Sequence, residues 1–251
     1  MLAADGLRKA FRRGRGVVDV SLRLHAGEIV GLLGSNGAGK TTTFRMLTGE
    51  IVPDAGTVRL GDRDVGRWPL KRRVREAGLG YLPQEPSVFA DLTTEDNLLA
   101  ILHARGVEAA SRRRRVDEVL RRLALGDMRR VLARDLSGGQ RRRLELARCL
   151  LGDPQVILLD EPFAGVDPLN VDEIQRLIRD LRAGGIAVLI SDHQVVETLR
   201  LVDRAYVLHA GRVLFAGTPR QLVHDPQVRR HYLGDESPAA IATTSCGAKA
   251  A

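Results

Sequence analysis

The chain lacks the features that mark secreted, membrane-spanning or metal-bound proteins. It has two cysteines, Cys149 and Cys246, and they give neither a disulfide framework nor the spacing of a metal site. No apolar run reaches the roughly 18 residues that a membrane helix needs. The N-terminal segment MLAADGLRKAF has no apolar signal-peptide core. We therefore expect a cytoplasmic protein in which Cys149 is a small core residue.

Lysine and aromatic residues are also scarce. Aromatic residues make up 4% of the chain, and arginine supplies 35 of the 39 basic residues. A net charge of +8 suits nucleic acid or an anionic membrane surface, but the excess of arginine favours the compositional bias of a GC-rich genome. The arginine run at 112–115 begins an amphipathic helix without interleaved aromatic residues. We interpret it as a solvated face and expect no direct binding of nucleic acid.

The chain does carry the pattern of an α/β fold. Buried apolar strands are expected at 28–33, 155–160 and 187–191, a hairpin at 205–217, and helices at about 40–48 and 169–183. Strands that alternate with helices predict a mostly parallel sheet covered on both faces. We expect an antiparallel β subdomain as well, from short strands before residue 65. A helical stretch at about 90–150 predicts an inserted α-helical subdomain, within a domain spanning 1–234. Residues 235–251 are small and polar, which predicts a disordered tail.

The segment GSNGAGKT at 34–41 fits the phosphate-binding pattern G-x-x-x-x-G-K-[ST]. It follows a predicted strand and opens a predicted helix, which is the context that this P-loop motif requires. Lys40 is expected to reach the β- and γ-phosphates, Thr41 to bind Mg²⁺, and Thr42 to contact the α-phosphate. The remaining loop residues supply backbone N–H groups to the phosphates: Gly34, Ser35, Asn36, Gly37, Ala38 and Gly39.

Polar side chains at the ends of three further segments point to hydrolysis. Asp160 ends a buried strand and is expected to bind Mg²⁺, and Glu161 is the candidate base for the attacking water. Taken alone, these acids would suit a helix cap, but the P-loop upstream favours the catalytic interpretation. His193 is expected beside the γ-phosphate. Gln84 is expected to offer its oxygen to Mg²⁺ and its nitrogen to water, although a lone glutamine usually faces solvent.

The segment LSGGQ at 136–140 predicts a second anion-binding helix end. Ser137 is a good N-cap, and Gln140 completes a capping box. Gly138 and Gly139 bare backbone N–H groups at the positive end of the helix dipole.

The P-loop, LSGGQ, LLDEP, the glutamine loop and the strand-end histidine, together with their flanking segments, resemble the ATP-binding subunits of ATP-binding cassette (ABC) transporters over about residues 5–234. The resemblance implies ATP and Mg²⁺ as cofactors and a head-to-tail homodimer, in which Ser137, Gly138, Gly139 and Gln140 contact the ATP held by the other copy. It also implies that Phe11 stacks on adenine and that Asp167 lies along the dimer interface. Two inner-membrane subunits would hold the cargo, and the ATPase would sit peripherally on the cytoplasmic face.

Longer segments, such as GLGYLPQEPSVFADLTTEDNL and LLDEPFAGVDPLNV, are similar to the lipopolysaccharide-export branch of this family. Ser35, Gln140 and the tail past Asp235 depart from that branch. An ATPase of branched-chain amino-acid import remains an alternative, and a non-transport ABC ATPase is a less favoured one. Phe89 has two interpretations: it fills the core, or it is an exposed anchor for a membrane subunit.

Overall fold

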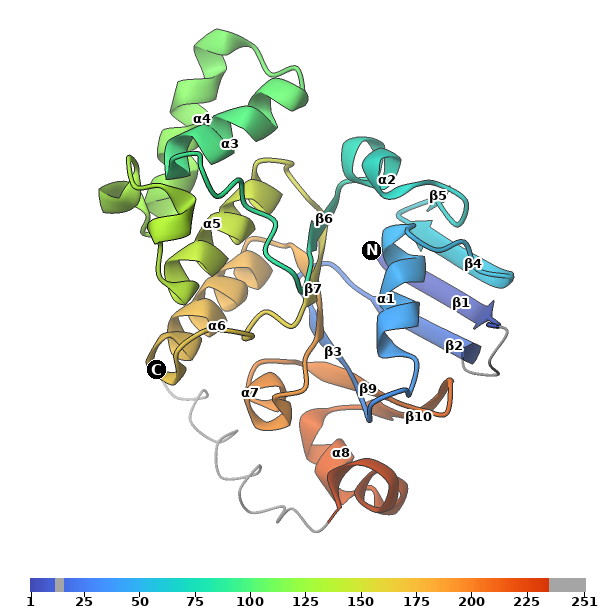
Figure 1. The fold of residues 1–251 in the computed structure, drawn as a ribbon. Helices are drawn as coiled ribbons and strands as arrows, with labels where there is room; N and C mark the ends of the chain where they lie inside the picture. Colours follow the sequence, from blue (N-terminus) through green and yellow to red (C-terminus); the bar gives the residue numbers. More distant parts are fainter. Residues whose placement is uncertain (12–15, 235–251) are drawn as a thin grey trace.

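The computed structural model describes residues 1–11 and 16–234 (Figure 1). The predicted tail and Cys246 lie outside the described residues. The described strands form one ten-stranded sheet in the order β5-β4-β1-β2-β10-β9-β3-β8-β7-β6. The α/β fold is therefore confirmed.

One half of the sheet, from β9 to the edge strand β6, is parallel, as predicted. It contains β3 (Ile29–Gly34), β6 (Leu79–Leu82), β7 (Val156–Asp160), β8 (Ala187–Ser191) and β9 (Arg204–His209). Strand β3 pairs in parallel with both β8 and β9, and β7 pairs in parallel with β6 and β8. Every residue of β3, β7 and β8 is buried. Continuous apolar runs give this outcome because helices cover both faces of a parallel sheet.

The antiparallel part contains β1 (Leu2–Lys9), β2 (Val17–Leu24), β4 (Ala55–Leu60) and β5 (Arg63–Asp64). It is continuous with the parallel part, because β10 (Arg212–Gly217) pairs with β2 at one position and with β9 along its length. The turn between β9 and β10 has positive φ at Ala210 (48°) and Gly211 (75°), as a tight hairpin turn requires.

The helices at the two predicted positions are α1 (Lys40–Thr48) and α6 (Pro168–Ala183). The stretch at 90–150 contains α3 (Thr94–Ala104), α4 (Ala109–Arg122) and α5 (Gly138–Leu150), which gather at one side of the molecule in Figure 1. Two short 3-10 turns, η1 (Gly126–Met128) and η2 (Ala133–Asp135), interrupt its helical period. Gly106 and Ala124 adopt positive φ after α3 and α4, so neither helix continues.

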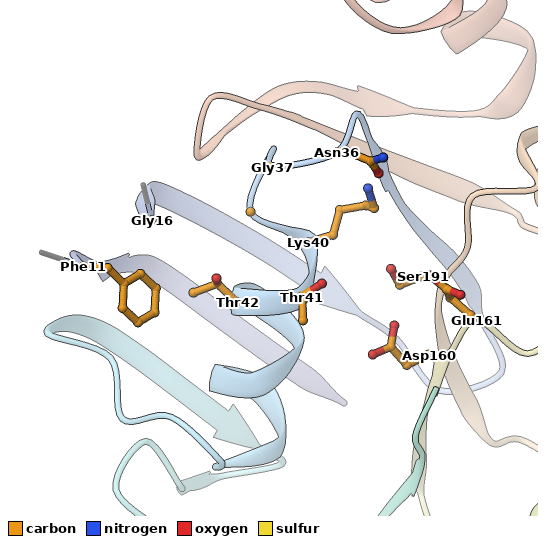
Figure 2. Close-up of a pocket in the computed structure, with 11 residues that line it drawn as sticks. Phe11, Gly16, Asn36, Gly37, Lys40, Thr41, Thr42, Asp160, Glu161 and Ser191 are labelled. Carbon is orange, nitrogen blue, oxygen red and sulfur yellow. The ribbon is translucent and has the colours of Figure 1, made fainter. Parts of the chain in front are cut away.

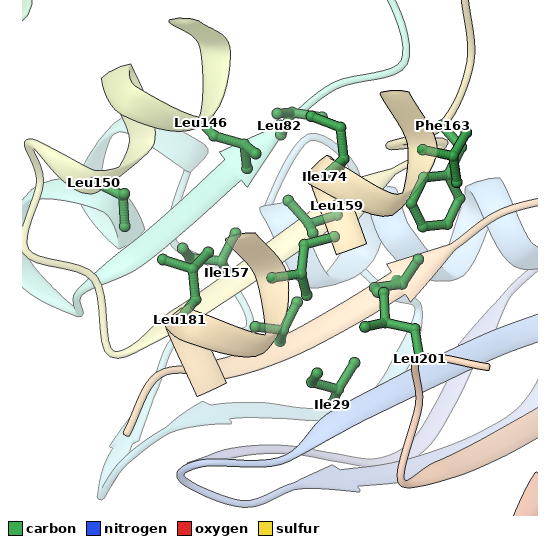
Figure 3. Close-up of a cluster of buried hydrophobic side chains, with 14 of the residues drawn as sticks. Ile29, Leu82, Leu146, Leu150, Ile157, Leu159, Phe163, Ile174, Leu181 and Leu201 are labelled. Carbon is green, nitrogen blue, oxygen red and sulfur yellow. The ribbon is translucent and has the colours of Figure 1, made fainter. Parts of the chain in front are cut away.

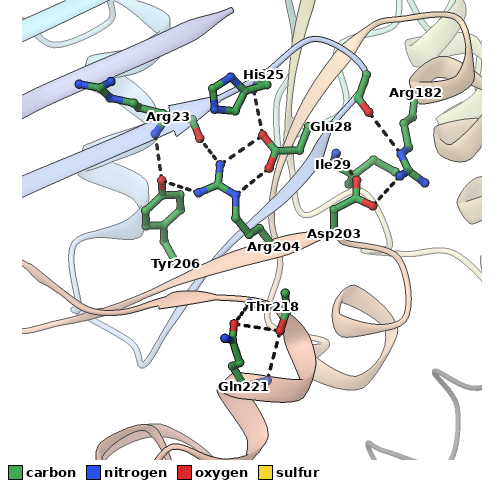
Figure 4. Close-up of polar contacts among 11 residues, drawn as sticks. Arg23, His25, Glu28, Ile29, Arg182, Asp203, Arg204, Tyr206, Thr218 and Gln221 are labelled. Atoms are coloured by element: carbon green, nitrogen blue, oxygen red, sulfur yellow. Dashed lines mark hydrogen bonds and ion pairs between the residues drawn. The ribbon is translucent and has the colours of Figure 1, made fainter.

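The sequence analysis missed the short elements α2 (Leu70–Glu76), α7 (Val195–Leu199), α8 (Pro219–His224), α9 (Pro226–Val228) and η3 (Arg229–Leu233). A signal was available for α8. Thr218 and Gln221 form a capping box, in which the backbone N–H of Gln221 donates to Thr218 Oγ1 over 3.3 Å (Figure 4).

Two apolar clusters pack on opposite faces of the sheet. Along β3, Ile29 and Leu33 belong to one cluster, and Val30 and Leu32 belong to the other. Figure 3 shows the first cluster, where side chains of the sheet meet those of α5 and α6. The second cluster contains Phe44 of α1. The alternation of side chains along β3 therefore places α1 and α5 on different faces.

A polar network fixes the beginning of β3 at the edge opposite the phosphate loop (Figure 4). The Arg204 guanidinium donates to both carboxylate oxygens of Glu28, at 2.6 and 3.2 Å, and to the Tyr206 hydroxyl at 2.9 Å. Asp203 accepts the backbone N–H of Ile29 over 2.9 Å. Bidentate contacts of this kind hold a strand in register.

In the described part of the chain, no helix combines the length and the apolar character that crossing a bilayer requires. Cys149 is half-buried against the first cluster, and its thiol donates to the Tyr81 carbonyl over 3.2 Å. Burial raises the pKa of Cys149 to about 12, so this thiol is an inert packing group.

Candidate nucleotide-binding and catalytic site

A pocket of about 230 Å³ lies where the carboxyl ends of β3, β7 and β8 meet the beginning of α1 (Figure 2). Topology puts it there, because ligands of open α/β sheets bind beyond the carboxyl ends of the strands. The residues that line it are Phe11, Gly16, Asn36, Gly37, Gly39, Lys40, Thr41, Thr42, Asp160, Glu161 and Ser191. Gly16 and Ser191 were missed by the sequence analysis.

The loop between β3 and α1 has the backbone that its glycines predict. Gly39 precedes α1 with φ 108°, and the N-terminus of the helix has no side-chain cap. Gly34 has φ 147°, and a Cβ atom there would overlap the carbonyl oxygen of Leu208. The uncapped start of α1 leaves its first N–H groups to face an anion. The Ala38 N–H, which was also predicted to contact phosphate, donates to the Ser35 carbonyl over 3.1 Å. Lys40 reaches back over it, with Nζ donating to the carbonyls of Gly34 (2.5 Å) and Ser35 (3.1 Å). Burial lowers the pKa of Lys40.

Asp160 faces the Thr41 hydroxyl across the pocket in Figure 2. Its carboxylate is buried, and burial, followed by the charge of Glu161, raises the pKa of Asp160 to about 6. A carboxylate in this setting gains from a cation beside it. Among residues 1–11 and 16–234, no cluster of three His, Cys, Asp or Glu side chains could hold a metal alone. The donor set of one carboxylate and one hydroxyl instead fits Mg²⁺, which completes its shell with phosphate oxygens and water.

Two residues from separate parts of the sequence, Gln84 and His193, approach Glu161. Gln84 Nε2 donates to Glu161 Oε2 over 3.0 Å, and His193 Nδ1 lies 3.6 Å from the same oxygen. The structure thus brings together the three residues that the sequence named as catalytic. Neither Gln84 nor His193 lines the pocket, and the nitrogen of Gln84 that was expected to contact water contacts Glu161 instead.

The backbone of Glu161 is strained, with φ at 50°. Its N–H donates to the Ser191 carbonyl over 2.7 Å. The buried Arg142 guanidinium donates to the carbonyl oxygens of Asp160 (3.1 Å), Glu161 and Pro162 (3.1 Å). These contacts over-determine the turn and hold Glu161 in a conformation that it would not adopt alone.

Arg142 also connects this turn to the segment around Gln84. It donates to the carbonyl of Pro83 (3.2 Å) and to the carboxylate of Glu145 (2.8 Å), and Glu145 accepts the N–H of Ser87 (2.7 Å). Sequence analysis could not single out Arg142, because it stands between two other arginines.

The LSGGQ helix end forms the capping box that was predicted. The Gln140 N–H donates to Ser137 Oγ over 3.2 Å, and the Ser137 N–H donates to Gln140 Oε1 over 2.9 Å. None of the residues from Ser137 to Gln140 lines the pocket. Within one chain, the structure therefore does not bring the two anion-binding helix ends together.

Phe11, which is 43% exposed, lines the outer part of the pocket near Thr42 (Figure 2). Phe89 is 49% exposed, and the Arg148 guanidinium lies 4.8 Å from its ring centre. The interpretation of Phe89 as core filling is therefore wrong. Asp167 is exposed and directly precedes α6.

This arrangement defines a P-loop nucleotide-binding protein, and the comparisons with known proteins specify it further. Residues 17–164 match the ABC transporter family, and the chain belongs to that family. It is 53% identical to the lipopolysaccharide export system ATP-binding protein LptB of Acidithiobacillus ferridurans and 48% identical to LptB of Escherichia coli K12. In each case the alignment covers 94% of this chain and 98% of the relative. The chain is therefore an LptB-like ABC ATPase.

The solved structures agree with this assignment. An ATP-binding cassette of an ABC transporter in its ADP conformation superposes with a TM-score of 0.81 at 26% identity, covering 94% of this chain and 99% of that one. A nucleotide-free cassette gives a TM-score of 0.83 at the same identity and coverage. Nucleotide binding by this chain follows from the family and from this fold.

Proposed function

We propose that the chain is the ATP-hydrolysing subunit of a transporter that extracts lipopolysaccharide from the inner membrane. The observation that carries the proposal is the near-full-length similarity to LptB. The contacts of Gln84 and His193 with Glu161 support it. Branched-chain amino-acid import is not favoured by these relatives. We further propose that residues 1–234 form the ATPase domain, with a helical subdomain at about 90–150.

In the proposed reaction, the P-loop holds the phosphates of ATP, and Lys40 and the loop N–H groups balance their charge. Asp160, Thr41 and the side-chain oxygen of Gln84 would hold Mg²⁺. The ion would stabilise the negative charge of the β- and γ-phosphates. Glu161 accepts a proton from the attacking water. The contacts from Gln84 and His193 to Glu161 Oε2 support this role, because they orient its other carboxylate oxygen. Phe11 offers an exposed ring face for the adenine base.

We propose that the second helix end serves a second copy of the chain. Its position outside the pocket supports this arrangement, since Ser137, Gly138, Gly139 and Gln140 then face the ATP of the partner copy. Two membrane subunits would complete the transporter and bind the cargo, so the ATPase contacts neither lipopolysaccharide nor nucleic acid. It would act peripherally on the cytoplasmic face of the inner membrane.

Phe89 is the proposed contact with a membrane subunit. Its ring is exposed, while its backbone is fixed by the buried Asn97, whose side chain accepts the Phe89 N–H (2.8 Å) and donates to the Phe89 carbonyl (3.0 Å). A rigid, exposed aromatic side chain is well suited to anchor an interface. Ordering of the loop that begins at Gln84 by the γ-phosphate would couple ATP binding to this contact.

Co-purification with lipopolysaccharide-export membrane subunits tests the proposal. Phe89→Ala should leave the isolated chain folded and its basal ATPase nearly intact, and should weaken recovery of the membrane subunits about tenfold. Val52→Ala is the matched control, because Val52 is equally exposed but distant in sequence from this loop. Recovery of amino-acid import subunits by the wild-type chain would reject the proposed cargo, and equal recovery by both variants would reject the anchor.

A further inference from the structure

The first helical residue of α5 packs against the turn that carries Glu161. A Cβ atom built on Gly138 would overlap the carbonyl oxygen of Gly165, which is backbone and cannot move aside as a side chain can. Gly165 itself has φ 68° and stands four residues after Glu161. Gly138 therefore has a reason to be glycine that lies within its own chain, apart from baring an N–H group to a partner.

The segment from Glu161 to Val166 is a compact set of turns. The Ala164 N–H donates to the Glu161 carbonyl over 3.1 Å, and the Val166 N–H donates to the Phe163 carbonyl over 3.2 Å. The two residues that flank Gly165 are therefore hydrogen-bonded back to this turn, Ala164 to Glu161 itself.

Helix α5 holds this segment at two points on one of its faces. Gly138 and Arg142 are four residues apart and so lie one above the other on the helix. Gly138 abuts the Gly165 carbonyl, and Arg142 bonds to the carbonyls of Asp160, Glu161 and Pro162. Since Glu161 has a strained φ of 50°, its geometry depends on such external contacts.

We infer that Gly138 is a positioning residue for Glu161 of the same chain. The inference rests on the proposed catalytic role of Glu161. It adds that the helix end facing a partner's ATP also sets the geometry of its own chain's catalytic base.

Hydrogen exchange in the nucleotide-free chain tests the packing directly. Gly138→Ala keeps the N–H group, and we expect the amides of Ala164 and Val166 to exchange about tenfold faster. Gly139→Ala should have a smaller effect, because the atoms nearest to its Cβ belong to the Asn170 side chain, at 3.3 Å and beyond. Gly126→Ala is the control, since a Cβ atom there meets nothing within 4 Å. Wild-type exchange rates at Ala164 and Val166 in the folded Gly138→Ala variant would overturn the inference.

A second variant covers the case in which Gly138→Ala does not fold. Arg142→Lys keeps the charge but cannot reach three carbonyls at once, and we expect the same two amides to exchange about tenfold faster. If they exchange at the wild-type rate, α5 does not hold the segment and the inference is wrong.

Mixed dimers separate this inference from the proposed dimer. One copy carries Lys40→Ala, so that the remaining active site combines the P-loop and Glu161 of the other copy with an unaltered LSGGQ. Gly138→Ala placed in that other copy should lower ATP turnover about tenfold, measured against the same dimer without it. Unchanged turnover would overturn the positioning role. If mixed dimers never form, the head-to-tail proposal fails, while the exchange experiment still decides the inference.

Discussion

The N-termini of α1 and α5 are both suited to anions, but the protein builds them differently. Helix α1 follows Gly39, has no side-chain cap and opens into the pocket. Helix α5 follows Ser137, has a complete capping box and lies outside the pocket. An uncapped helix end leaves its first N–H groups to a ligand. The capping box of α5 engages the N–H groups of Ser137 and Gln140 but not those of Gly138 and Gly139. The comparison supports the proposal that α1 binds nucleotide in the single chain and that α5 acts when a second copy approaches it.

The largest expected effect comes from replacing the proposed base Glu161, which lines the pocket at the start of α1 and whose turn packs against the start of α5. Glu161→Gln removes the base but keeps the side-chain shape, so ATP turnover should fall on the order of 10²–10⁴-fold while ATP remains bound. Size-exclusion chromatography with ATP and Mg²⁺ should show a stable dimer. If the variant stays monomeric at saturating ATP, α5 does not meet a partner's nucleotide without the membrane subunits.

Lys40→Ala should weaken ATP binding to the isolated monomer by roughly 10–100-fold, because it removes a charge-assisted contact to phosphate. Calorimetric titration of the monomer measures this change. Ser137→Ala is the matched variant at the other helix end, and equal losses of affinity in both variants would contradict the contrast between α1 and α5.

Asp160→Asn tests the acid beside the α1 end in the metal-free protein. The folded pKa of Asp160, about 6, lies above the ordinary value, so the folded state binds the proton more tightly than the unfolded state. Stability from this group is therefore lost as pH rises from about 4 to 6. With EDTA present, Asp160→Asn should be about 1–3 kcal/mol more stable than wild type at pH 8, and the gain should vanish at pH 4. Thermal unfolding at the two pH values measures it, and a gain independent of pH would contradict the explanation.

Ser137→Ala should produce the smallest effect. Loss of the cap should reduce the free energy of unfolding by about 1 kcal/mol and leave the monomer's affinity for ATP unchanged. Thr218→Ala removes an equivalent capping box from α8 and is the control for a purely structural loss. If Ser137→Ala alone also slows turnover in the dimer, its hydroxyl has a role beyond capping.

The sequence was sufficient for the parts of the site that depend on local pattern. The P-loop, Asp160 and the capping box at Ser137 are each fixed by neighbours within a few residues, so their structures follow from short motifs. Arg142 could not be predicted, because only the packing of α5 decides which of three consecutive arginines points inward. The exposure of Phe89 likewise depends on Asn97 of α3, whose side chain bonds to the backbone N–H and carbonyl of Phe89.

The pairing of β3 has a consequence for synthesis on the ribosome. The strand that leads into the P-loop pairs only with β8 and β9 among the described strands, and its register with β9 joins Gly34 to Leu208. At roughly 5–20 residues per second, the ribosome needs about 10–30 s to make the intervening chain. The nucleotide pocket is therefore assembled near the end of translation, after the helical stretch at 90–150 has been made. The nascent P-loop strand has no native strand partner until β8 is made, and its pairing is complete only when β9 follows, so its edges are open to wrong pairing during synthesis.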